Sequence, residues 1–197
     1  MRLEVLISCM NQTDYELIKR SRITTDVLMI NQTDFESIDT VQKFGQIIRR
    51  INTKERGLSR SRNMALENAQ GDICLICDDD EIFTDQYQTI ICQAFEKLHD
   101  ADIIAFDLDN KVTRLKPRIQ RVGRLKSLKL ASYQLALKRT AILSSGVRFD
   151  PLMGSGTGNG AGEENKFLLD CLQKGLRIYY VPQTIGQVCY GPSNWFT

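Results

Sequence analysis

Short apolar runs alternate with polar connectors along the first part of the chain. Four such runs precede residue 80: 3–7, 27–30, 47–51 and 73–77. Apolar runs of this length with polar flanks indicate strands. Residues 58–69 instead carry Leu58, Ala65 and Leu66 on one helical face, with Gly71 expected just after the helix C-cap. Strands alternating with helices predict a largely parallel sheet.

The second part of the chain continues this pattern. Apolar residues at three- and four-residue steps predict a helix over 87–98 with Thr84 as its N-cap, and another over 163–174 ended by Gly175. Strands are predicted at 103–108 and 133–137, and a last one at 177–181 that Pro182 ends. No Pro- or Gly-rich linker divides the chain, so we expect one α/β domain over 1–197.

The composition, with 42% hydrophobic and 25% charged residues, is typical of a soluble globular protein. No apolar run is long enough to cross a bilayer, and Glu4 interrupts the first ten residues, which favours a cytoplasmic location. The six cysteines lie scattered in apolar segments, as expected of buried thiols without disulfides. Cys74 and Cys77 share one predicted strand and should point to opposite faces, so they cannot bind one metal ion together.

The net charge of +2 is unevenly distributed. Residues 111–149 contain eleven Lys or Arg and no Asp or Glu, which leaves −9 on the rest of the chain. This asymmetry favours an anionic partner near the segment, although a solvated basic loop explains it equally well. Residues 111–129 hold eight basic residues and no aromatic one, so a nucleic-acid partner is disfavoured for lack of a stacking platform.

Polar segments follow two of the predicted strands. Residues 11–16 and 31–36 are near copies of each other and lie at the expected carboxyl ends of the first two strands, where open α/β sheets bind ligands. Two polar turns stabilised by local hydrogen bonds are the alternative.

Four acidic residues, Asp78 to Glu81, follow the predicted strand 73–77 directly. Adjacent carboxylates repel one another, and a divalent cation shared with a diphosphate would neutralise them. A solvated acidic loop is the alternative. A phosphatase of the haloacid dehalogenase type is disfavoured because the cluster lies mid-chain and carries Ile82 where that pattern has Thr or Val.

A glycine-rich segment, 154–162, precedes Glu163 and Glu164. Five glycines in nine residues allow close backbone approach to a ligand, or a loop that moves over one. A phosphate-binding loop is disfavoured because no Gly-Lys-Ser/Thr follows. Favourable interaction with the helix dipole alone would also explain the two glutamates.

The order of these motifs resembles glycosyltransferase family 2. Residues 56–63 are similar to the family's Gly-x-Ser-x-Ala-Arg-Asn helix, and 71–80 to its strand ending in Asp-x-Asp. Residues 146–150, 160–165 and 175–182 are similar to its Glu-Asp region and final strand. The resemblance implies a GT-A fold: a Rossmann-like, mainly parallel sheet flanked by helices, with a small antiparallel portion in the C-terminal half. It also implies a nucleotide-binding half (1–109) and an acceptor-side half (110–197).

The same resemblance implies the site residues. Asp80 and Asp78 would hold Mn²⁺ or Mg²⁺, and Glu164 would be the general base, with Glu163 as its rival. The nucleotide-sugar would contact a set of polar residues: Ser8, Asn11, Gln12, Asn31, Gln32, Arg56, Arg60, Arg62, Asp78 and Asp79.

The implied reaction is transfer, with inversion, from a UDP-sugar to a saccharide or lipid-linked saccharide in bacterial surface-polysaccharide synthesis. The basic segment 111–129 would then border the acceptor or meet anionic lipid at the inner face of the cell membrane. Two departures from the family, Glu164 in place of Asp and His99 as the only histidine, keep a catalytically inactive binding module as the alternative. A sugar nucleotidyltransferase would need glycine within 8–14, which has none. The chain ends soon after its last predicted strand, so we expect a C-terminal truncation.

Overall fold

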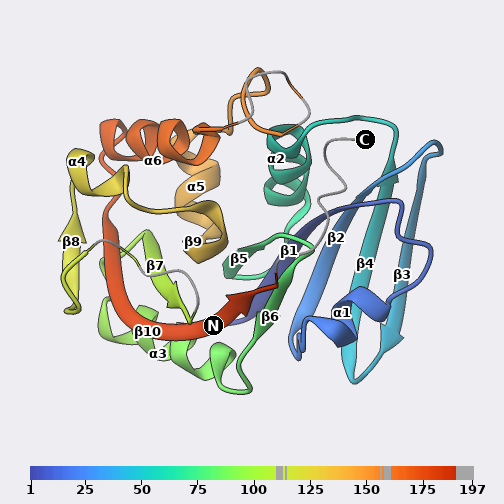
Figure 1. Ribbon diagram of the computed structural model, residues 1–197, viewed down its shortest axis with the longest axis horizontal. Helices are drawn as coiled ribbons and strands as arrows, with labels where there is room; N and C mark the ends of the chain where they lie inside the picture. Colours follow the sequence, from blue (N-terminus) through green and yellow to red (C-terminus); the bar gives the residue numbers. More distant parts are fainter. Residues whose placement is uncertain (110–112, 114, 156, 158–160, 190–197) are drawn as a thin grey trace.

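Ten strands form one sheet in the computed structural model (Figure 1), which describes residues 1–109, 113, 115–155, 157 and 161–189. The strands are β1 (Leu3–Met10), β2 (Asp26–Gln32), β3 (Ser37–Lys43), β4 (Gln46–Thr53), β5 (Ile73–Cys77), β6 (Glu81–Phe83), β7 (Ile103–Leu108), β8 (Gln120–Val122), β9 (Leu135–Lys138) and β10 (Ile178–Val188). The helices are α1 (Glu16–Arg20), α2 (Leu58–Asn68), α3 (Tyr87–Lys97), α4 (Arg124–Ser127), α5 (Arg139–Ser145) and α6 (Glu163–Gln173), and a 3₁₀ turn, η1, spans Ser132–Gln134.

The sheet combines a parallel core with antiparallel additions. Its order is β3-β4-β2-β1-β5-β9-β7-β10-β6, and β8 pairs with β10 outside this path. Strands β4, β2, β1 and β5 are mutually parallel, whereas β9 runs antiparallel to both of its neighbours, β5 and β7. The predicted α/β architecture with an antiparallel portion in the C-terminal half is confirmed.

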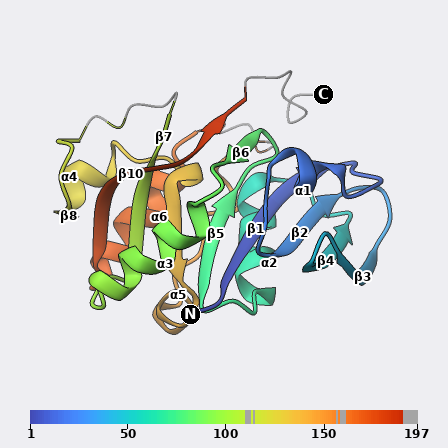
Figure 2. The ribbon, with the colours of Figure 1, turned by 90° about the horizontal axis from the view of Figure 1, so that it is seen from below.

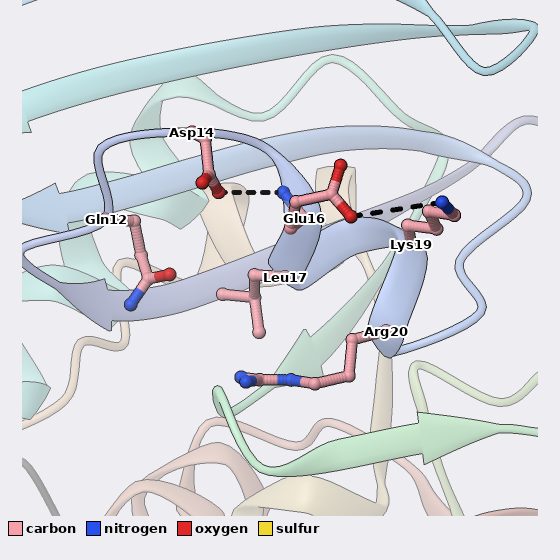
Figure 3. Close-up of a pocket in the computed structure, with 6 residues that line it drawn as sticks. All are labelled: Gln12, Asp14, Glu16, Leu17, Lys19 and Arg20. Carbon is pink, nitrogen blue, oxygen red and sulfur yellow. Dashed lines mark hydrogen bonds and ion pairs between the residues drawn. The ribbon is translucent and has the colours of Figure 1, made fainter.

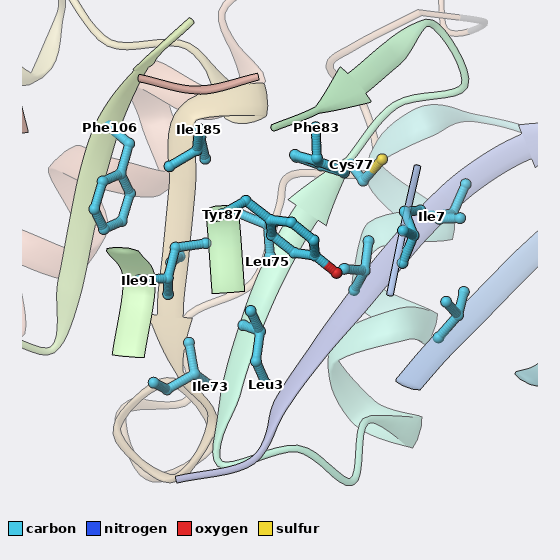
Figure 4. Close-up of a cluster of buried hydrophobic side chains, with 14 of the residues drawn as sticks. Leu3, Ile7, Ile73, Leu75, Cys77, Phe83, Tyr87, Ile91, Phe106 and Ile185 are labelled. Atoms are coloured by element: carbon cyan, nitrogen blue, oxygen red, sulfur yellow. The ribbon is translucent and has the colours of Figure 1, made fainter. Parts of the chain in front are cut away.

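Helices cover both faces of the sheet (Figure 2). Alternate residues of β5 enter different apolar clusters. Leu75 and Cys77 pack with α1 and α3, next to Tyr87 and Ile91 (Figure 4), whereas Cys74 packs with α2, α5 and α6. This division confirms that the two cysteines of the CxxC point to opposite faces. Four cysteines are buried, as expected of thiols in apolar segments, whereas Cys92 is half-buried and Cys189 is exposed.

Strand β3 has no counterpart in the sequence prediction. It pairs antiparallel with β4 at the edge of the sheet, and most of its side chains are exposed. Backbone pairing alone therefore defines it, without an apolar run to reveal it.

Three local predictions were wrong. Pro182 does not end the last strand: β10 continues to Val188, and its pairing with β7 is irregular between Tyr180 and Thr184, where a proline is tolerated. Thr84 does not cap α3, because its hydroxyl donates instead to the carbonyl of Ile185. Gly71 does not adopt a left-handed conformation after α2; a Cβ there would lie 2.6 Å from that of Glu4, so close packing requires glycine.

Gly175 does have the predicted role. It adopts φ +83° after α6, and the Leu176 N–H donates to the Cys171 carbonyl, as in a Schellman cap. Among the described residues, no helix has the length and apolar character required to cross a bilayer.

Candidate active site

A buried arginine joins the two predicted acidic motifs. Arg62 Nη2 donates to Asp78 Oδ1 at 2.9 Å and to Oδ2 at 3.2 Å, and Nη1 donates to Glu163 Oε1 at 3.0 Å. Nη2 also donates to the hydroxyl of Ser132 at 2.8 Å. The side chain of Arg62 is only 2% exposed. The guanidinium group of Arg62 therefore holds the carboxyl end of β5 and the beginning of α6 together.

Helical spacing explains the burial of Arg62. It lies four residues after Leu58 and four before Leu66, so it shares their inward face of α2, whereas Arg60 is exposed. The Arg62 guanidinium carbon lies 5.5 Å from the centre of the Phe149 ring, which stacks in turn on Phe167. The arginine is thus enclosed by aromatic as well as acidic side chains.

The acidic turn after β5 contains two perturbed carboxyls. Glu81 is buried, and its Oε1 accepts a 2.8 Å hydrogen bond from the Asp78 N–H. Burial, and then the nearby charge of Asp78, raise the pKa of Glu81 well above its usual range. Burial and the charges of Asp78 and Asp80 raise the pKa of Asp79 to about 6. Negative charge at this turn is therefore unfavourable without a cation in addition to Arg62.

The turn fits a divalent cation that is shared with a ligand. Among the described residues, no group of three or more His, Cys, Asp or Glu side chains could hold a metal ion. Asp80 is exposed and Asp78 is half-buried, and Glu81 Oε2 is a buried oxygen without a hydrogen-bond partner in the described part of the chain. Carboxylate oxygens are ligands that Mg²⁺ and Mn²⁺ prefer, and these ions usually take their remaining ligands from substrate phosphates and water.

Glu163 and Glu164 differ in their surroundings, although they are adjacent. Glu163 is buried and bound to Arg62, whereas Glu164 is half-buried. Burial raises the pKa of Glu164, and the charge and hydrogen bond of Glu163 raise it further. Glu164 is therefore the more accessible of the two groups, and its carboxyl has a raised pKa.

The described part of the glycine-rich segment lies against α2. Leu58 N–H donates to the Ser155 carbonyl, and the Ser59 hydroxyl donates to the Met153 carbonyl. Gly154 has φ +98°, and a Cβ there would lie 3.2 Å from Ser59 Oγ and 3.3 Å from Glu163 Cδ. Gly156, Gly158 and Gly160 lie outside the described residues.

The two near-repeats contact each other. The Asn31 side chain accepts from the Gln12 N–H and donates to the Gln12 carbonyl, both at 2.9 Å, and it also donates to Asn52 Oδ1 at 2.7 Å. Asn11, with φ +52°, donates from its N–H to the Gln32 carbonyl. The repeats therefore fix the shape of the loops at the carboxyl ends of β1 and β2.

Other predicted donor-site residues bind the framework in the same region. Ser61 donates to the hydroxyl of Ser8, and Gln32 accepts from the N–H of Gly57. Arg56 lies at the rim, where it donates to the Thr33 carbonyl and to Asp34. Arg60, as noted, points into solvent.

An open pocket of about 560 Å³ lies beside these loops (Figure 3). It is lined mainly by polar side chains of the 12–20 segment: Gln12, Asp14, Glu16, Leu17, Lys19 and Arg20. Arg20 also donates to the Asp79 carbonyl at 3.2 Å, which connects the pocket to the acidic turn.

The structure adds residues that the sequence did not identify. Ser132 and Asn52 accept hydrogen bonds from Arg62 and Asn31, and neither belongs to a recognisable motif. The buried position of Arg62 did have a signal, namely its four-residue spacing from Leu58 and Leu66. His99 is exposed just beyond the end of α3.

Solved structures with the same architecture include several of S. aureus TarS. TarS 1-349 has a TM-score of 0.68 at 14% identity, over 96% of this chain and 60% of that one. TarS 1-349 in complex with UDP-GlcNAc has a TM-score of 0.69 at 14% identity, over 99% of this chain and 60% of that one. The complex with UDP has a TM-score of 0.69 at 14% identity, over 98% of this chain and 61% of that one. This chain thus spans about three fifths of their length, and the likeness establishes a GT-A fold.

The sequence comparison identifies the family. A search of curated proteins finds no match. The model of "Glycosyl transferase family 2" matches residues 34–150, which is more than half of the chain and includes α2 and the acidic turn. The chain belongs to glycosyl transferase family 2.

Proposed function

We propose that the chain transfers a sugar from a UDP-sugar to a saccharide or lipid-linked saccharide, with inversion at the anomeric carbon. The observation that carries this proposal is the pairing of Arg62 with both Asp78 and Glu163. It brings the expected donor-binding carboxylates and the expected base to one end of the sheet, where α/β folds bind ligands. The S. aureus TarS complexes with UDP-GlcNAc and UDP support UDP as the nucleotide.

On the donor side, Asp80 and Asp78 would hold Mn²⁺ or Mg²⁺. When bound, this ion neutralises negative charge on the departing diphosphate. Arg62 fixes the orientation of Asp78, and Asn31 fixes the Gln12 loop. The donor would thus meet pre-formed loops at the ends of β1, β2 and β5.

On the acceptor side, Glu164 would take the proton of the attacking hydroxyl. The acceptor oxygen forms a bond to the anomeric carbon while the bond from that carbon to the diphosphate oxygen breaks, and UDP leaves with the bonding electrons. Attack opposite the leaving group inverts the configuration. Glu163 is less suited to this role because Arg62 already uses its carboxylate.

We further propose that the acceptor belongs to bacterial surface-polysaccharide synthesis on the cytoplasmic side of the membrane. The basic segment 111–129 supports an acceptor or neighbouring surface that carries phosphate.

The test is transfer and hydrolysis of a panel of UDP-sugars with Mn²⁺, with GDP- and CMP-sugars as controls. We expect turnover with a UDP-sugar. Asp80→Asn should lose the activity that depends on Mn²⁺. Glu164→Gln should still bind the donor, but its rate of transfer should fall roughly 10²–10⁴-fold. Glu67→Gln, an exposed glutamate on α2, is the matched control and should keep full activity. Absence of both turnover and metal-dependent UDP binding would refute the proposal.

The second candidate is a binding module without turnover. Glu164 favours it, because the family's pattern has an aspartate at this place. Metal-dependent UDP binding without hydrolysis or transfer, for every sugar in the panel, would support this candidate instead.

A further inference from the structure

One surface of the molecule, at 116–129, carries both basic and large apolar side chains. Its basic members are all exposed: Lys116, Arg118, Arg121, Arg124, Lys126 and Lys129. Ile119, Leu125 and Leu128 lie among them and are 41%, 83% and 50% exposed. We call these nine residues the 116–129 surface. It covers β8 and α4, at the end of the molecule opposite β3 (Figures 1 and 2).

The exposed leucines are not needed to hold this segment in place. Val122, Ser127 and Leu130 are the buried residues here, and β8 pairs with β10. Leu125 and Leu128 sit on either side of Ser127 and point outward, although folding normally leaves large apolar groups this exposed only singly. Two such leucines within four residues therefore suggest a partner with an apolar part.

Several basic side chains of this surface have no acidic partner close by among the described residues. Residues 111–149 contain no Asp or Glu, and within the described part of the chain Lys116, Arg118 and Arg124 form no salt bridge. The partner should therefore carry several negative charges.

We infer that the 116–129 surface docks on an anionic lipid bilayer. The basic side chains would contact headgroup phosphates, while Leu125, Leu128 and Ile119 enter the boundary between headgroups and acyl chains. A soluble phosphorylated polymer would satisfy the charges but leave the leucines in water. A lipid surface satisfies both halves of the pattern.

Docking through this surface also has a geometric consequence for the site. Helix α4 packs against α6, which begins with Glu163 and Glu164. A bilayer bound at α4 would thus lie beside the half of the protein that carries the expected base. The docking itself does not depend on the proposed activity.

Co-sedimentation of the full chain with vesicles tests this inference. Vesicles of phosphatidylcholine alone are compared with vesicles of equal parts phosphatidylcholine and phosphatidylglycerol, without any donor or acceptor. We expect binding to the anionic vesicles alone, weakening with added salt. Arg118→Gln and Arg124→Gln should each weaken it about fivefold, and Leu125→Ser and Leu128→Ser roughly tenfold each.

Matched variants elsewhere on the protein distinguish docking through the 116–129 surface from a general effect of net charge or surface hydrophobicity. Lys54→Gln and Lys97→Gln remove exposed positive charges, and Ile38→Ser removes an apolar side chain that is 77% exposed. All three should bind as the unchanged chain does, and thermal unfolding should show every variant folded. If the arginine variants lose binding but the two leucine variants keep it, the contact is purely electrostatic, the leucines do not enter the bilayer, and the inference is wrong. Equal binding to neutral vesicles would overturn it as well.

Discussion

A single nitrogen of Arg62, Nη2, donates to both carboxylate oxygens of Asp78, at 2.9 and 3.2 Å. The other terminal nitrogen is used by Glu163, so the arginine balances two acidic groups that lie 85 positions apart in the sequence. Since the arginine is enclosed, neither carboxylate can lose it without leaving charge in a poorly hydrated place.

Arg62→Ala should therefore be strongly destabilising. We expect a loss of about 3–5 kcal/mol in the free energy of unfolding, because two carboxylates lose their buried partner. Urea denaturation measures it. Arg148→Ala, which breaks the more exposed pair with Glu67, should cost less than about 1 kcal/mol. Similar losses in the two variants would contradict a structural role for the Arg62 pairs.

The pH dependence of transfer should report Glu164. A general base acts in its deprotonated form, and the pKa of this carboxyl is raised by burial and by Glu163. Activity should fall as the pH drops through that raised pKa, so the acidic limb of kcat/KM should lie above the usual glutamate value of about 4.3.

Glu163→Gln should move this acidic limb to lower pH. The substitution removes the neighbouring charge that raises the pKa of Glu164, so the base stays deprotonated further into the acid range. Glu67→Gln should leave the limb in place. A limb that does not respond to Glu163→Gln, in a variant shown to be folded, would assign the titration to another group.

Gly154→Ala should be more costly than Gly146→Ala. Both glycines have positive φ, +98° and +69°, so alanine is strained by roughly 1–2 kcal/mol at either. A Cβ at Gly154 also crowds Ser59 and Glu163, whereas one at Gly146 meets nothing within 4 Å. We expect an additional 1–3 kcal/mol or so at Gly154, measured by chemical denaturation. Equal costs would mean that the loop moves aside without penalty.

Asn31→Asp should destabilise the loop contact between the two near-repeats. The new oxygen would face the Gln12 carbonyl and Asn52 Oδ1, where the amide now donates. We expect a loss of about 2–3 kcal/mol near neutral pH that shrinks in acid, because a protonated carboxyl can donate again. Gln42→Glu, on the exposed strand β3, is the control for replacing an amide by a carboxylate and should change stability by less than about 0.5 kcal/mol. Denaturation curves measured near neutral pH and in acid test this prediction, and a loss of the same size at both pH values would contradict it.

Much of the fold was predictable because its helices and central strands carry apolar periodicity. The prediction of a helix over 87–98 matches α3, Tyr87–Lys97, since Tyr87, Ile91 and Phe95 form its buried stripe. Strand β3 could not be found in this way, because its side chains mostly face solvent and its identity depends on a partner strand. The prediction that Pro182 ends the last strand failed for a related reason. The irregular pairing that tolerates this proline is a property of β10 and β7 together.

For the candidate site, the motifs were visible but their connection was not. Asp78 and Glu163 could each be selected from local sequence, yet nothing in either segment shows that one arginine holds both. Arg62 was expected, with Arg56 and Arg60, to contact the nucleotide-sugar, although its spacing from Leu58 and Leu66 already favours an inward position. Its contacts favour a role in positioning the carboxylates. The cation and the base remain predictions.

The position of β9 has a consequence for how the chain is made. β9 separates β5 from β7 in the sheet, yet it follows both in the sequence. A nascent chain that has emerged from the ribosome only as far as β7 therefore has one edge of β5 and one edge of β7 that await β9, which has not yet emerged. At a synthesis rate of about 5–20 residues per second, those edges stay open for seconds, the interval in which a chaperone would matter most.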